Sequence, residues 1–436
     1  MGTHSSSIRS SSSAAIANIE SGLKDLRAIV GEEHARPCGA EDSVDRTSPR
    51  LLLEPGTAEE LASILKAATA AGLHVIPRGG GSKMEWGNAP SHANVIVSTR
   101  RLRRVLEHAH SDMTATVEAG CTIQQLQNTL AEHGQRLALD PLWPEKATIG
   151  GVLATNDSGS LRIRFGSLRD LIIGITLALP DGTLAKSGGK VVKNVAGYDL
   201  PKLATGSLGT LAVITQAVFR LHPLPRETRL ISFSVPDHKA ANFLVLSILD
   251  STLVPSGLQL RFTSPARLEI DVRFEGTTAG CEEQRAQTLR LAAHATEIVC
   301  DPTIWKAPET LWNGTEPAVV AKFSLLPSAL DTFLSQLSQI SERLQLSSRI
   351  VAQGVGVGLL RFEAQDCAAL LVAIHELRRQ VESAAGSFSV LHCPAEIKSK
   401  IDVWGSAGDA LQLMRNIKAR FDPTGTLNPG RFIGGI

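Results

Sequence analysis

The chain of 436 residues lacks several features that mark particular classes of protein. An excess of one charge is missing: 44 Lys and Arg stand against 43 Asp and Glu, so the net charge of +1 gives no reason to expect nucleic acid or an anionic membrane as a partner. No apolar run approaches the roughly 20 residues of a membrane-spanning helix. The serine-rich start, MGTHSSSIRSSSSAA, has no apolar centre, so we predict a disordered tail and not a secretory signal.

Clustered cysteine is missing as well. The six cysteines are scattered along the chain: Cys38, Cys121, Cys281, Cys300, Cys367 and Cys393. No two of them are separated by two residues, which excludes zinc ribbons and cysteine-clustered iron–sulfur sites, and we predict no metal site. Scattered thiols are typical of a reducing cytoplasm, where we expect the protein to be located.

What is present indicates more than one domain, as the length also predicts. After a helix expected at residues 16–30, residues 51–83 read as strand, helix, strand and glycine turn, with Thr57 and Glu60 as a capping box and Gly72 as the helix stop. Strands are predicted at 95–100 and 114–120, and a helix from Thr122 to Gly134. Beyond the linker HPLPRE, a strand–helix pattern occurs twice, which predicts an antiparallel sheet with helices on one face.

The stretch VIPRGGGSK, residues 75–83, carries the first motif with chemical content. Its glycines match neither the P-loop pattern nor G-x-G-x-x-G. Consecutive glycines nevertheless allow several backbone N–H groups to point into one concavity that binds an anion, and Ser82 adds a hydroxyl donor. A flexible turn at the end of a strand is the alternative.

Two further glycine-rich stretches follow. ATIGGVLATNDSGSLRIRFGSLRD, residues 147–170, has exposed backbone amides around Thr148 that could bind the polar atoms of a ring or ribityl chain. GGKVVKNVAGYDLPKLATGSLGTLAVIT, residues 188–215, holds Tyr198, the one tyrosine of the chain, between Gly197 and Asp199. Each stretch alone is also compatible with a loop of the scaffold.

Together, the three stretches resemble the flavin-binding domain of the vanillyl-alcohol-oxidase/p-cresol-methylhydroxylase (PCMH) family, in order and in spacing, from about residue 49 to 225. The resemblance implies FAD, bound noncovalently because RGGGSK holds neither His nor Cys. It implies that the pyrophosphate is bound by Arg78, Gly79, Gly80, Gly81, Ser82 and Lys83. It implies further cofactor contacts from Thr148, Gly150, Gly151, Asn156, Ser158, Gly159, Gly206, Gly209 and Ile214.

A narrower resemblance rests on KNVAGYDLPKL (193–203) and FDPTGTLNPGRF (421–432), which look like the glycolate oxidase group of D-2-hydroxy-acid oxidoreductases, and most like the accessory FAD-binding subunit of glycolate oxidase. The implied fold class is α+β: a two-subdomain FAD-binding PCMH-type domain, then a ferredoxin-like α+β cap domain, then a C-terminal segment that returns to the FAD domain. The implied divisions are a tail and helix at 1–48, the FAD domain at 49–225, the cap at 226–395 and the C-terminal segment at 396–436.

The sequence departs from the catalytic members of that group at one point. Their cap carries an H-x-G-D-G-N-x-H motif, whereas QGVGVGLLRF, residues 353–362, has the glycines and no histidine. The departure argues against a metal and against independent oxidation of a hydroxy acid. It favours a subunit that works with a catalytic flavin subunit, an iron–sulfur subunit and a small 2-hydroxy acid, in the cytoplasm or at the inner membrane through those partners. A self-sufficient dehydrogenase of another alcohol or acid, and a flavin-binding assembly scaffold, stay open as alternatives.

Oxidation of a 2-hydroxy acid needs a group that holds the carboxylate and a group that accepts the hydroxyl proton. Arg261 and Arg361 are candidate clamps, or else strand arginines at the surface. Tyr198, with Lys193, is a candidate donor near the flavin, or else packs beside an ion pair of Asp199. The candidate proton acceptors are His392 and Glu396, with a structural role as the alternative. Arg431 is expected to pin the C-terminus, with a contact to the cofactor as the alternative.

Overall fold

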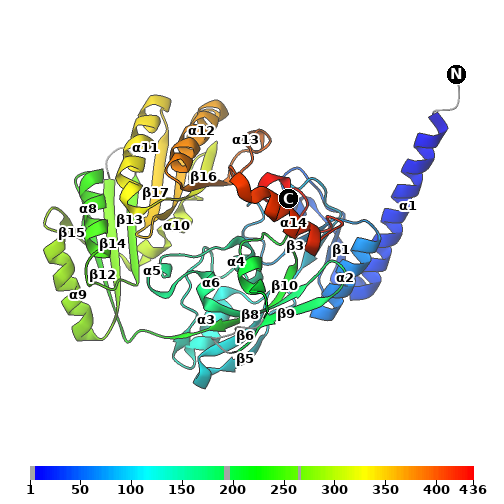
Figure 1. Cartoon of the computed structure of the whole chain (residues 1–436), viewed down its shortest axis with the longest axis horizontal. Helices are drawn as coiled ribbons and strands as arrows, with labels where there is room; N and C mark the ends of the chain where they lie inside the picture. Colours follow the sequence, from blue (N-terminus) through cyan, green and yellow to red (C-terminus); the bar gives the residue numbers. More distant parts are fainter. Residues whose placement is uncertain (1–4, 191–196, 264–266) are drawn as a thin grey trace.

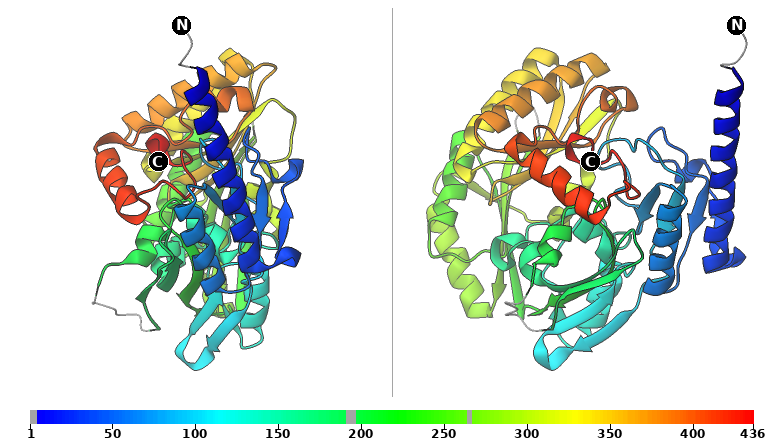
Figure 2. Two further views of the ribbon diagram at one scale, coloured as in Figure 1. Left: turned by 90° about the vertical axis from the view of Figure 1, so that its right-hand side faces the viewer. Right: turned by 45° about the vertical axis from the view of Figure 1, so that its right-hand side comes forward.

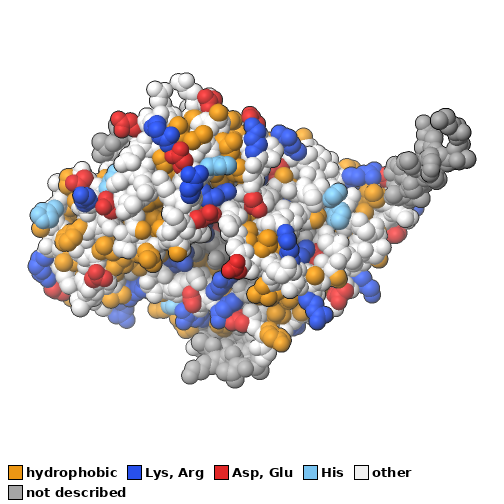
Figure 3. All heavy atoms as spheres, turned by 45° about the horizontal axis from the view of Figure 1, so that its top comes forward, with side chains coloured by type: hydrophobic (Ala, Val, Ile, Leu, Met, Phe, Trp, Pro, Cys, Tyr) orange, Lys and Arg blue, Asp and Glu red, His pale blue; other side chains and the backbone are white. Residues whose placement is uncertain are grey.

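The computed structural model describes residues 5–190, 197–263 and 267–436, with side chains from residue 18 onward. Two lobes are visible in Figure 1: the first holds three sheets, and the second holds one sheet of eight strands. On the face in Figure 3, basic and acidic side chains are interspersed, in keeping with the small net charge. A search of the described residues finds no helix that is both long enough and apolar enough to cross a membrane.

The first sheet of the first lobe has the strand order β1-β2-β4-β3, with β2, β4 and β3 parallel and β1 antiparallel at the edge. Its elements are β1 (Ala35–Pro37), β2 (Leu51–Leu53), α2 (Ala58–Ala70), β3 (Val75–Arg78) and β4 (Val95–Ser98). The predicted N-cap of α2 is present, because Thr57 Oγ1 accepts the N–H of Glu60 at 3.0 Å, but the full capping box is not formed, because Glu60 Oε2 accepts the N–H of Gly56 at 2.7 Å and not that of Thr57. The strand–helix–strand prediction is therefore confirmed, while β1 was not predicted.

Helix α1 (Ser5–Val30) packs against α2 through Leu23, Leu26 and Val30 and stands at the edge of the first lobe (Figure 2). The prediction of a disordered tail before a helix at 16–30 was wrong for residues 5–15, which the structure places in the same helix. Serine is only a few tenths of a kcal/mol worse than alanine in a helix, and residues 5–15 contain no Gly or Pro that would interrupt one.

The second sheet is antiparallel, with the order β5-β6-β10-β8-β9. Its strands are β5 (Val105–Ala109), β6 (Thr114–Glu118), β8 (Ile172–Ala178), β9 (Leu184–Gly188) and β10 (Val213–Arg220). The helices around it are α3 (Ile123–Ala131), α4 (Ile149–Thr155), α5 (Arg162–Phe165), α6 (Leu168–Leu171) and α7 (Leu200–Ala204). A third, two-stranded sheet pairs β7 (Gln135–Arg136) with β11 (His222–Pro223). The predicted cap of α3 is confirmed, because Thr122 Oγ1 accepts the N–H of Gln125 at 3.1 Å.

The second lobe is one antiparallel sheet, ordered β15-β12-β14-β13-β17-β18-β16-β19, with long helices on one face (Figure 1). Its strands are β12 (Glu227–Ser234), β13 (Gly257–Thr263), β14 (Arg267–Gly276), β15 (Thr296–Ile298), β16 (Ala318–Ser324), β17 (Ser347–Gln353), β18 (Val357–Glu363) and β19 (Ser387–His392). Its helices are α8 (His238–Leu249), α9 (Thr278–Leu291), α10 (Ala307–Thr310), α11 (Leu330–Leu344) and α12 (Cys367–Ser383). The predicted repeat of the strand–helix pattern is confirmed.

Strand alternation leaves the other face of this sheet for the first lobe. On β16, Val319, Ala321 and Phe323 belong to the core under the helices, so Lys322 points to the opposite face. Side chains from that face reach the first lobe: Arg273 donates to Ser160 Oγ at 3.0 Å, and Glu275 pairs with Arg136.

The end of the chain returns to the first lobe after α13 (Ala395–Lys398) and α14 (Leu411–Phe421). The N–H of Val75 donates to Thr426 O at 2.7 Å, and the N–H of Asn428 donates to Val75 O at 2.9 Å. Leu427 is fully buried between them. The predicted return of the C-terminal segment is confirmed, while the domain boundaries at 48/49, 225/226 and 395/396 stay predictions.

Candidate flavin site

The glycine loop, Gly79–Ser82, follows β3 and lies directly on the backbone of residues 146–148. A Cβ on Gly80 would lie 1.7 Å from Lys146 O, and one on Gly79 would lie 2.1 Å from Thr148 Oγ1. Gly81 has a φ of +75°, which side chains with a Cβ rarely adopt. The three glycines therefore have different structural roles: Gly79 and Gly80 allow close packing, and Gly81 allows the turn.

The glycine loop separates two cavities. The larger loop cavity has a volume of about 830 Å³ and is also lined by Arg36, Asp42, Arg78, Arg100, Lys146, Trp143 and Trp312. The smaller loop cavity has a volume of about 70 Å³ and is also lined by Thr148, Gly151, Leu208, Asn428 and Arg431. A large cavity of this volume is in the range that binds cofactors and other small molecules.

Two arginines share one buried carboxylate at the larger loop cavity. Arg36 donates to Asp42 Oδ2 at 2.6 Å and to Oδ1 at 3.0 Å, and Arg78 donates to Oδ1 at 2.7 Å. The N–H of Gly39 adds a fourth bond, to Oδ2 at 2.9 Å. The Arg36 guanidinium, followed by the Gly39 N–H and Arg78, holds the pKa of Asp42 well below its usual range. Asp42 is therefore a fixed anion that aligns two cations.

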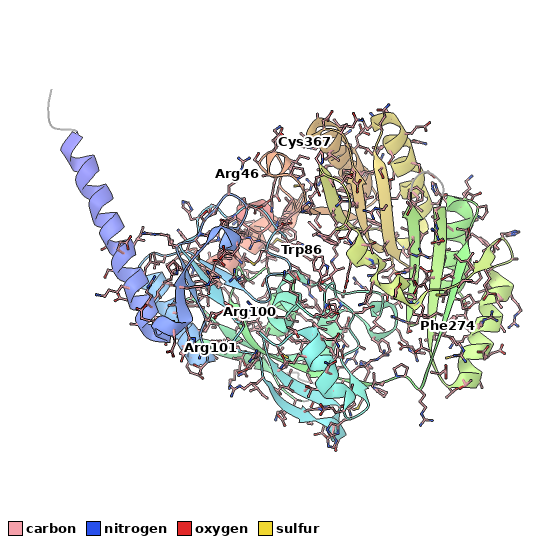
Figure 4. All side chains as sticks on the ribbon, turned by 180° about the vertical axis from the view of Figure 1, so that it is seen from behind. Arg46, Trp86, Arg100, Arg101, Phe274 and Cys367 are labelled. Carbon is pink, nitrogen blue, oxygen red and sulfur yellow. The ribbon has the colours of Figure 1, made fainter. Side chains whose placement is uncertain are left out.

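Lys83 links the glycine loop to the N-D-S-G turn. Its Nζ lies 3.0 Å from Asp157 Oδ2, and both side chains are more than 90% buried. The indole rings of Trp86 and Trp143 flank the ammonium at 5.6 and 5.5 Å, and Trp86 lies between the lobes in Figure 4. Asp157 Oδ2 also accepts the N–H of Leu142 at 3.0 Å. A buried charge pair therefore fixes the loop relative to the turn.

The smaller loop cavity holds buried polar atoms that bind no described atom. Asn428 Oδ1 and Arg431 Nε are two of them. Arg431 Nη2 donates to Met84 O and Trp86 O at 2.5 and 2.6 Å, which matches the predicted pinning of the C-terminus. Burial lowers the pKa of Arg431 to about 10. A ligand that satisfied the two orphan atoms would offset their desolvation.

The remaining residues of the predicted flavin set fall into two groups. Gly150 packs on Ala119, Gly206 and Gly209 have φ of +85° and +67°, and Ile214 is buried in β10, so these four shape the first lobe. The turn residues Asn156, Ser158 and Gly159 instead border the second lobe: Asn156 O accepts from Lys322, Ser158 O accepts from Gln353, and Gly159 lines a cavity together with residues of the second lobe. The predicted set is thus spread along a path from the glycine loop to the lobe boundary.

A third space, the interlobe cleft, lies at that boundary. It is lined from the first lobe by Trp86, Asp140, Pro141, Leu142, Asp157, Ser158, Gly159 and Ser160, and from the second by Gln259, Trp305, Pro308, Glu309, Lys322, Val351, Gln353, Val357, Gly358 and Leu359. The Lys322 ammonium makes one long contact, to Asn156 O at 3.5 Å, and burial lowers its pKa. Gln353 Oε1 is buried and binds no described atom. The cleft therefore offers a cation and a polar atom to a ligand.

The predicted arginine clamps are not brought to this cleft. Arg361 is 1% exposed and donates to Glu363 Oε1, Leu311 O and Thr315 O at 2.6, 3.3 and 2.6 Å. Arg261 bonds Asp271 through Nε and Nη2 at 2.7 and 3.0 Å. Strand alternation alone did not reveal that acidic side chains close by in the sheet already neutralise both guanidinium groups.

The other candidates also lie outside the cleft. Tyr198 is 90% exposed, with Asp199 paired to Lys202 beside it, and Lys193 lies outside the described residues. Glu396 pairs with Lys400 on the surface. His392 instead bridges the lobes: its Nδ1 lies 2.8 Å from Glu85 Oε2 and its Nε2 lies 3.4 Å from Glu316 Oε1.

The His392 bridge predicts a pH-dependent contribution to stability. The hydrogen bond to Glu85 raises the pKa of His392, so its contribution is fully present below the unfolded value of about 6.5 and is lost as pH rises through the raised folded value. We expect the loss of unfolding free energy in His392→Gln to be largest near pH 6 and to shrink above the folded pKa. Denaturant titrations of both proteins at several pH values measure this difference, and a difference that grew with pH would contradict the bridge.

Sequence reasoning missed Asp42, Lys322, Glu309 and Asn428. Asp42 lies in an ordinary acidic loop and Lys322 in a β-prone run, so neither has a local signal. Asn428 was inside a quoted motif, NPGRF, and its φ of +45° in a buried turn is the feature that marks it. Only the return of the chain to β3 brings Asn428 to the glycine loop.

The lobes and their glycine path define a flavoprotein with the fold of p-cresol methylhydroxylase. A solved structure of that enzyme matches with a TM-score of 0.74 and 13% identity, covering 95% of this chain and 96% of the other. The sequence matches the FAD binding domain at residues 49–188 and the C-terminal domain of FAD linked oxidases at residues 261–432. The chain belongs to the family of FAD-linked oxidoreductases, and its cofactor is FAD, as the resemblance predicted.

Two curated relatives cover nearly the whole chain. The D-lactate dehydrogenase of Archaeoglobus fulgidus is 26% identical over 411 residues, which are 88% of this chain and 91% of that protein. The glycolate oxidase subunit GlcD of Bacillus subtilis is 23% identical over 420 residues, which are 88% of this chain and 89% of that protein.

Three observations show that the described residues are suited to bind FAD. The glycine loop presents bare backbone to both loop cavities, the larger of which has a volume of about 830 Å³. The guanidinium groups of Arg36, Arg78 and Arg100 line the larger cavity, and guanidinium is a good partner for a diphosphate. The smaller cavity has an orphan acceptor and an orphan donor, Asn428 Oδ1 and Arg431 Nε.

Proposed function

We propose that this protein is the FAD-binding subunit of a glycolate oxidase-like complex that oxidises a small 2-hydroxy acid, with FAD held noncovalently along the path from the glycine loop to the interlobe cleft. The observation that carries the proposal is Lys322, a partly buried ammonium with one long hydrogen bond, facing the cleft from the second lobe. A carboxylate is the partner that such a cation lacks. Bound FAD supplies the hydride acceptor for oxidation of the alcohol carbon.

The same cleft offers a group that can accept the hydroxyl proton. Three carboxylates line it, and two are committed: Asp157 pairs with Lys83, and Asp140 accepts from the N–H and the hydroxyl of Ser160. Glu309 accepts the N–H of Trp143 through Oε1 at 3.0 Å, and no other described atom bonds to its carboxylate. Glu309 Oε2 is therefore the site that we assign to the proton.

Removal of the Lys322 charge is expected to weaken substrate binding. In Lys322→Met, the Kd for a hydroxy acid or a 2-keto acid analogue should rise about 10- to 100-fold, the range of a lost charge-assisted hydrogen bond. For the unchanged protein, affinity should fall as pH rises through the lowered pKa of Lys322, because an anion favours the ammonium. Titration of the flavin absorbance with oxalate measures both effects. Lys400→Met, which removes an exposed lysine just after α13, is the control and should leave the Kd unchanged.

The role as a complex subunit is supported by the histidine-free stretch at residues 353–362 and by the scattered cysteines. In such a complex this chain would work with a catalytic flavin subunit, and an iron–sulfur subunit would pass the electrons on. The presence of Lys322 and Glu309 in the cleft also favours the second candidate, a dehydrogenase that oxidises the hydroxy acid without other subunits.

Anaerobic mixing of the purified chain with glycolate, D-lactate and other 2-hydroxy acids distinguishes the two. Flavin that is reduced only in the presence of co-purified subunits supports the complex, and flavin that is reduced rapidly by the isolated chain supports the self-sufficient enzyme. A chain that retains FAD but shows no spectral response to any hydroxy acid or keto acid, with or without partners, would contradict both.

A further inference from the structure

The larger loop cavity contains a charged cluster, formed by Asp42, Arg36 and Arg78, whose role the proposed function does not explain. A buried carboxylate beside an anion site is unexpected, because a negative charge repels the diphosphate that the site is meant to hold. Asp42 is 2% exposed and accepts four hydrogen bonds, so neither water nor a ligand can reach it easily. Its function must be exerted through the arginines.

The geometry of Arg78 shows what Asp42 contributes. Arg78 ends β3 and immediately precedes Gly79, so its guanidinium belongs to the same turn as the glycine loop. Asp42 is bonded by one nitrogen, Nη1, at 2.7 Å, and no described atom accepts a hydrogen bond from Nε or Nη2. The side chain is 16% exposed and lines the cavity. Asp42 therefore holds the Arg78 guanidinium in place through Nη1, and the Nε and Nη2 donors stay available for a ligand in the cavity.

We infer that Asp42 is a positioning residue for the cofactor: it fixes Arg78, with Arg36 beside it, so that their unused N–H donors recognise the diphosphate of FAD. The inference rests on the proposed placement of FAD at the glycine loop. A preformed guanidinium loses less side-chain entropy when it binds, which is the benefit of holding it in place beforehand. Both arginines would act on the diphosphate, and Asp42 would touch no cofactor atom.

An electrostatic role and a positioning role of Asp42 predict opposite changes in FAD affinity for the same variant. One measurement therefore distinguishes the two roles. If Asp42 acted only by its field, Asp42→Asn would remove a repulsive charge and tighten FAD binding. If Asp42 acts by position, the same variant should weaken FAD binding about 10- to 100-fold. Asparagine keeps an oxygen for the Gly39 N–H, so the loop retains one of its bonds.

A neighbouring carboxylate supplies the matched control. Glu41 lines the same cavity and lies 3.7 Å from Arg36, but it is largely exposed and does not touch Arg78. Glu41→Gln removes one negative charge from the same place and should leave FAD binding unchanged or slightly tighter.

The experiment is a titration of flavin-stripped protein with FAD, ADP, FMN and riboflavin, followed by fluorescence. The expected result is a loss in Asp42→Asn for FAD and ADP, which carry a diphosphate, and no loss for riboflavin. In an Arg78→Met background, Asp42→Asn should cost little more, because the group through which it acts is gone. Should Asp42→Asn fail to fold, Arg78→Met alone must show the same selective loss of FAD and ADP.

Unchanged or tighter FAD binding in folded Asp42→Asn would overturn the inference, as would an equal loss for riboflavin. If FAD does not bind at the glycine loop at all, the result is different, because variants of the glycine loop itself would then bind FAD normally. In that case Asp42 and the glycine loop would both be excluded from the diphosphate site, and the inference would fall with the placement.

Discussion

Gly80→Val is expected to bind FAD at least about 100-fold more weakly than the unchanged protein, a loss of about 2.8 kcal/mol. A Cβ at this position would lie 1.7 Å from Lys146 O, a backbone atom that no rotamer can move aside. Either the glycine loop or residues 146–148 must shift, and both line the loop cavities. The flavin-to-protein absorbance ratio after purification, and titration with added FAD, measure the loss.

The control for this substitution is Gly276→Val at the end of β14. A Cβ there would meet nothing nearer than Cys281 Sγ at 3.9 Å, so the same change in size should be tolerated. Hydrogen exchange of the second lobe should be unaltered in Gly80→Val, because the glycine loop contributes nothing to the core of that lobe. Normal FAD occupancy in Gly80→Val would show that the glycine loop does not hold the cofactor.

Lys83→Met is expected to lower the free energy of unfolding by about 3–5 kcal/mol, the effect of removing one partner from a buried ion pair. Its ammonium and Asp157 are both more than 90% buried, so Asp157 would be left as an uncompensated charge. Two indole contacts are lost with it. Urea unfolding followed by tryptophan fluorescence measures the change.

A double variant distinguishes two costs of Lys83→Met: the lost attraction between Lys83 and Asp157, and the burial of an unpaired Asp157 carboxylate. In Lys83→Met/Asp157→Asn the carboxylate is replaced by an amide, whose oxygen can still accept the N–H of Leu142. We expect more than half of the lost stability to return, because the desolvated charge is the larger part of the cost. If the double variant were less stable than Lys83→Met, the pair would not be the reason for the loss.

The glycine stretches were predictable because each glycine meets a backbone demand that no other residue can meet. Gly81 allows the turn at a φ of +75°, and Gly79 and Gly80 allow the loop to lie against residues 146–148, so the run of glycines shows in the sequence even though its packing partner does not. The same reasoning found the caps at Thr57 and Thr122, because a cap is made by residues three positions apart.

The catalytic candidates were not predictable in this way. Arg361 and Arg261 alternate along strands as clamps would, but the folded sheet places Glu363 and Asp271 against them. Lys322 has the same local pattern and is the residue left facing the cleft. A side chain's charge is in the sequence, whereas its partner depends on how the strands pair and which face each side chain takes.

By itself, the sequence of this protein determined its family, its cofactor and the loop that is proposed to hold the diphosphate, because those depend on short runs with strict backbone demands. The tertiary structure alone decided which charges are paired and which remain available. It paired Lys83 with Asp157, Arg78 with Asp42 and Arg361 with Glu363, and it left Lys322 facing the interlobe cleft. Burial makes an unmatched charge costly, so the few that remain unmatched in the folded chain point to the site.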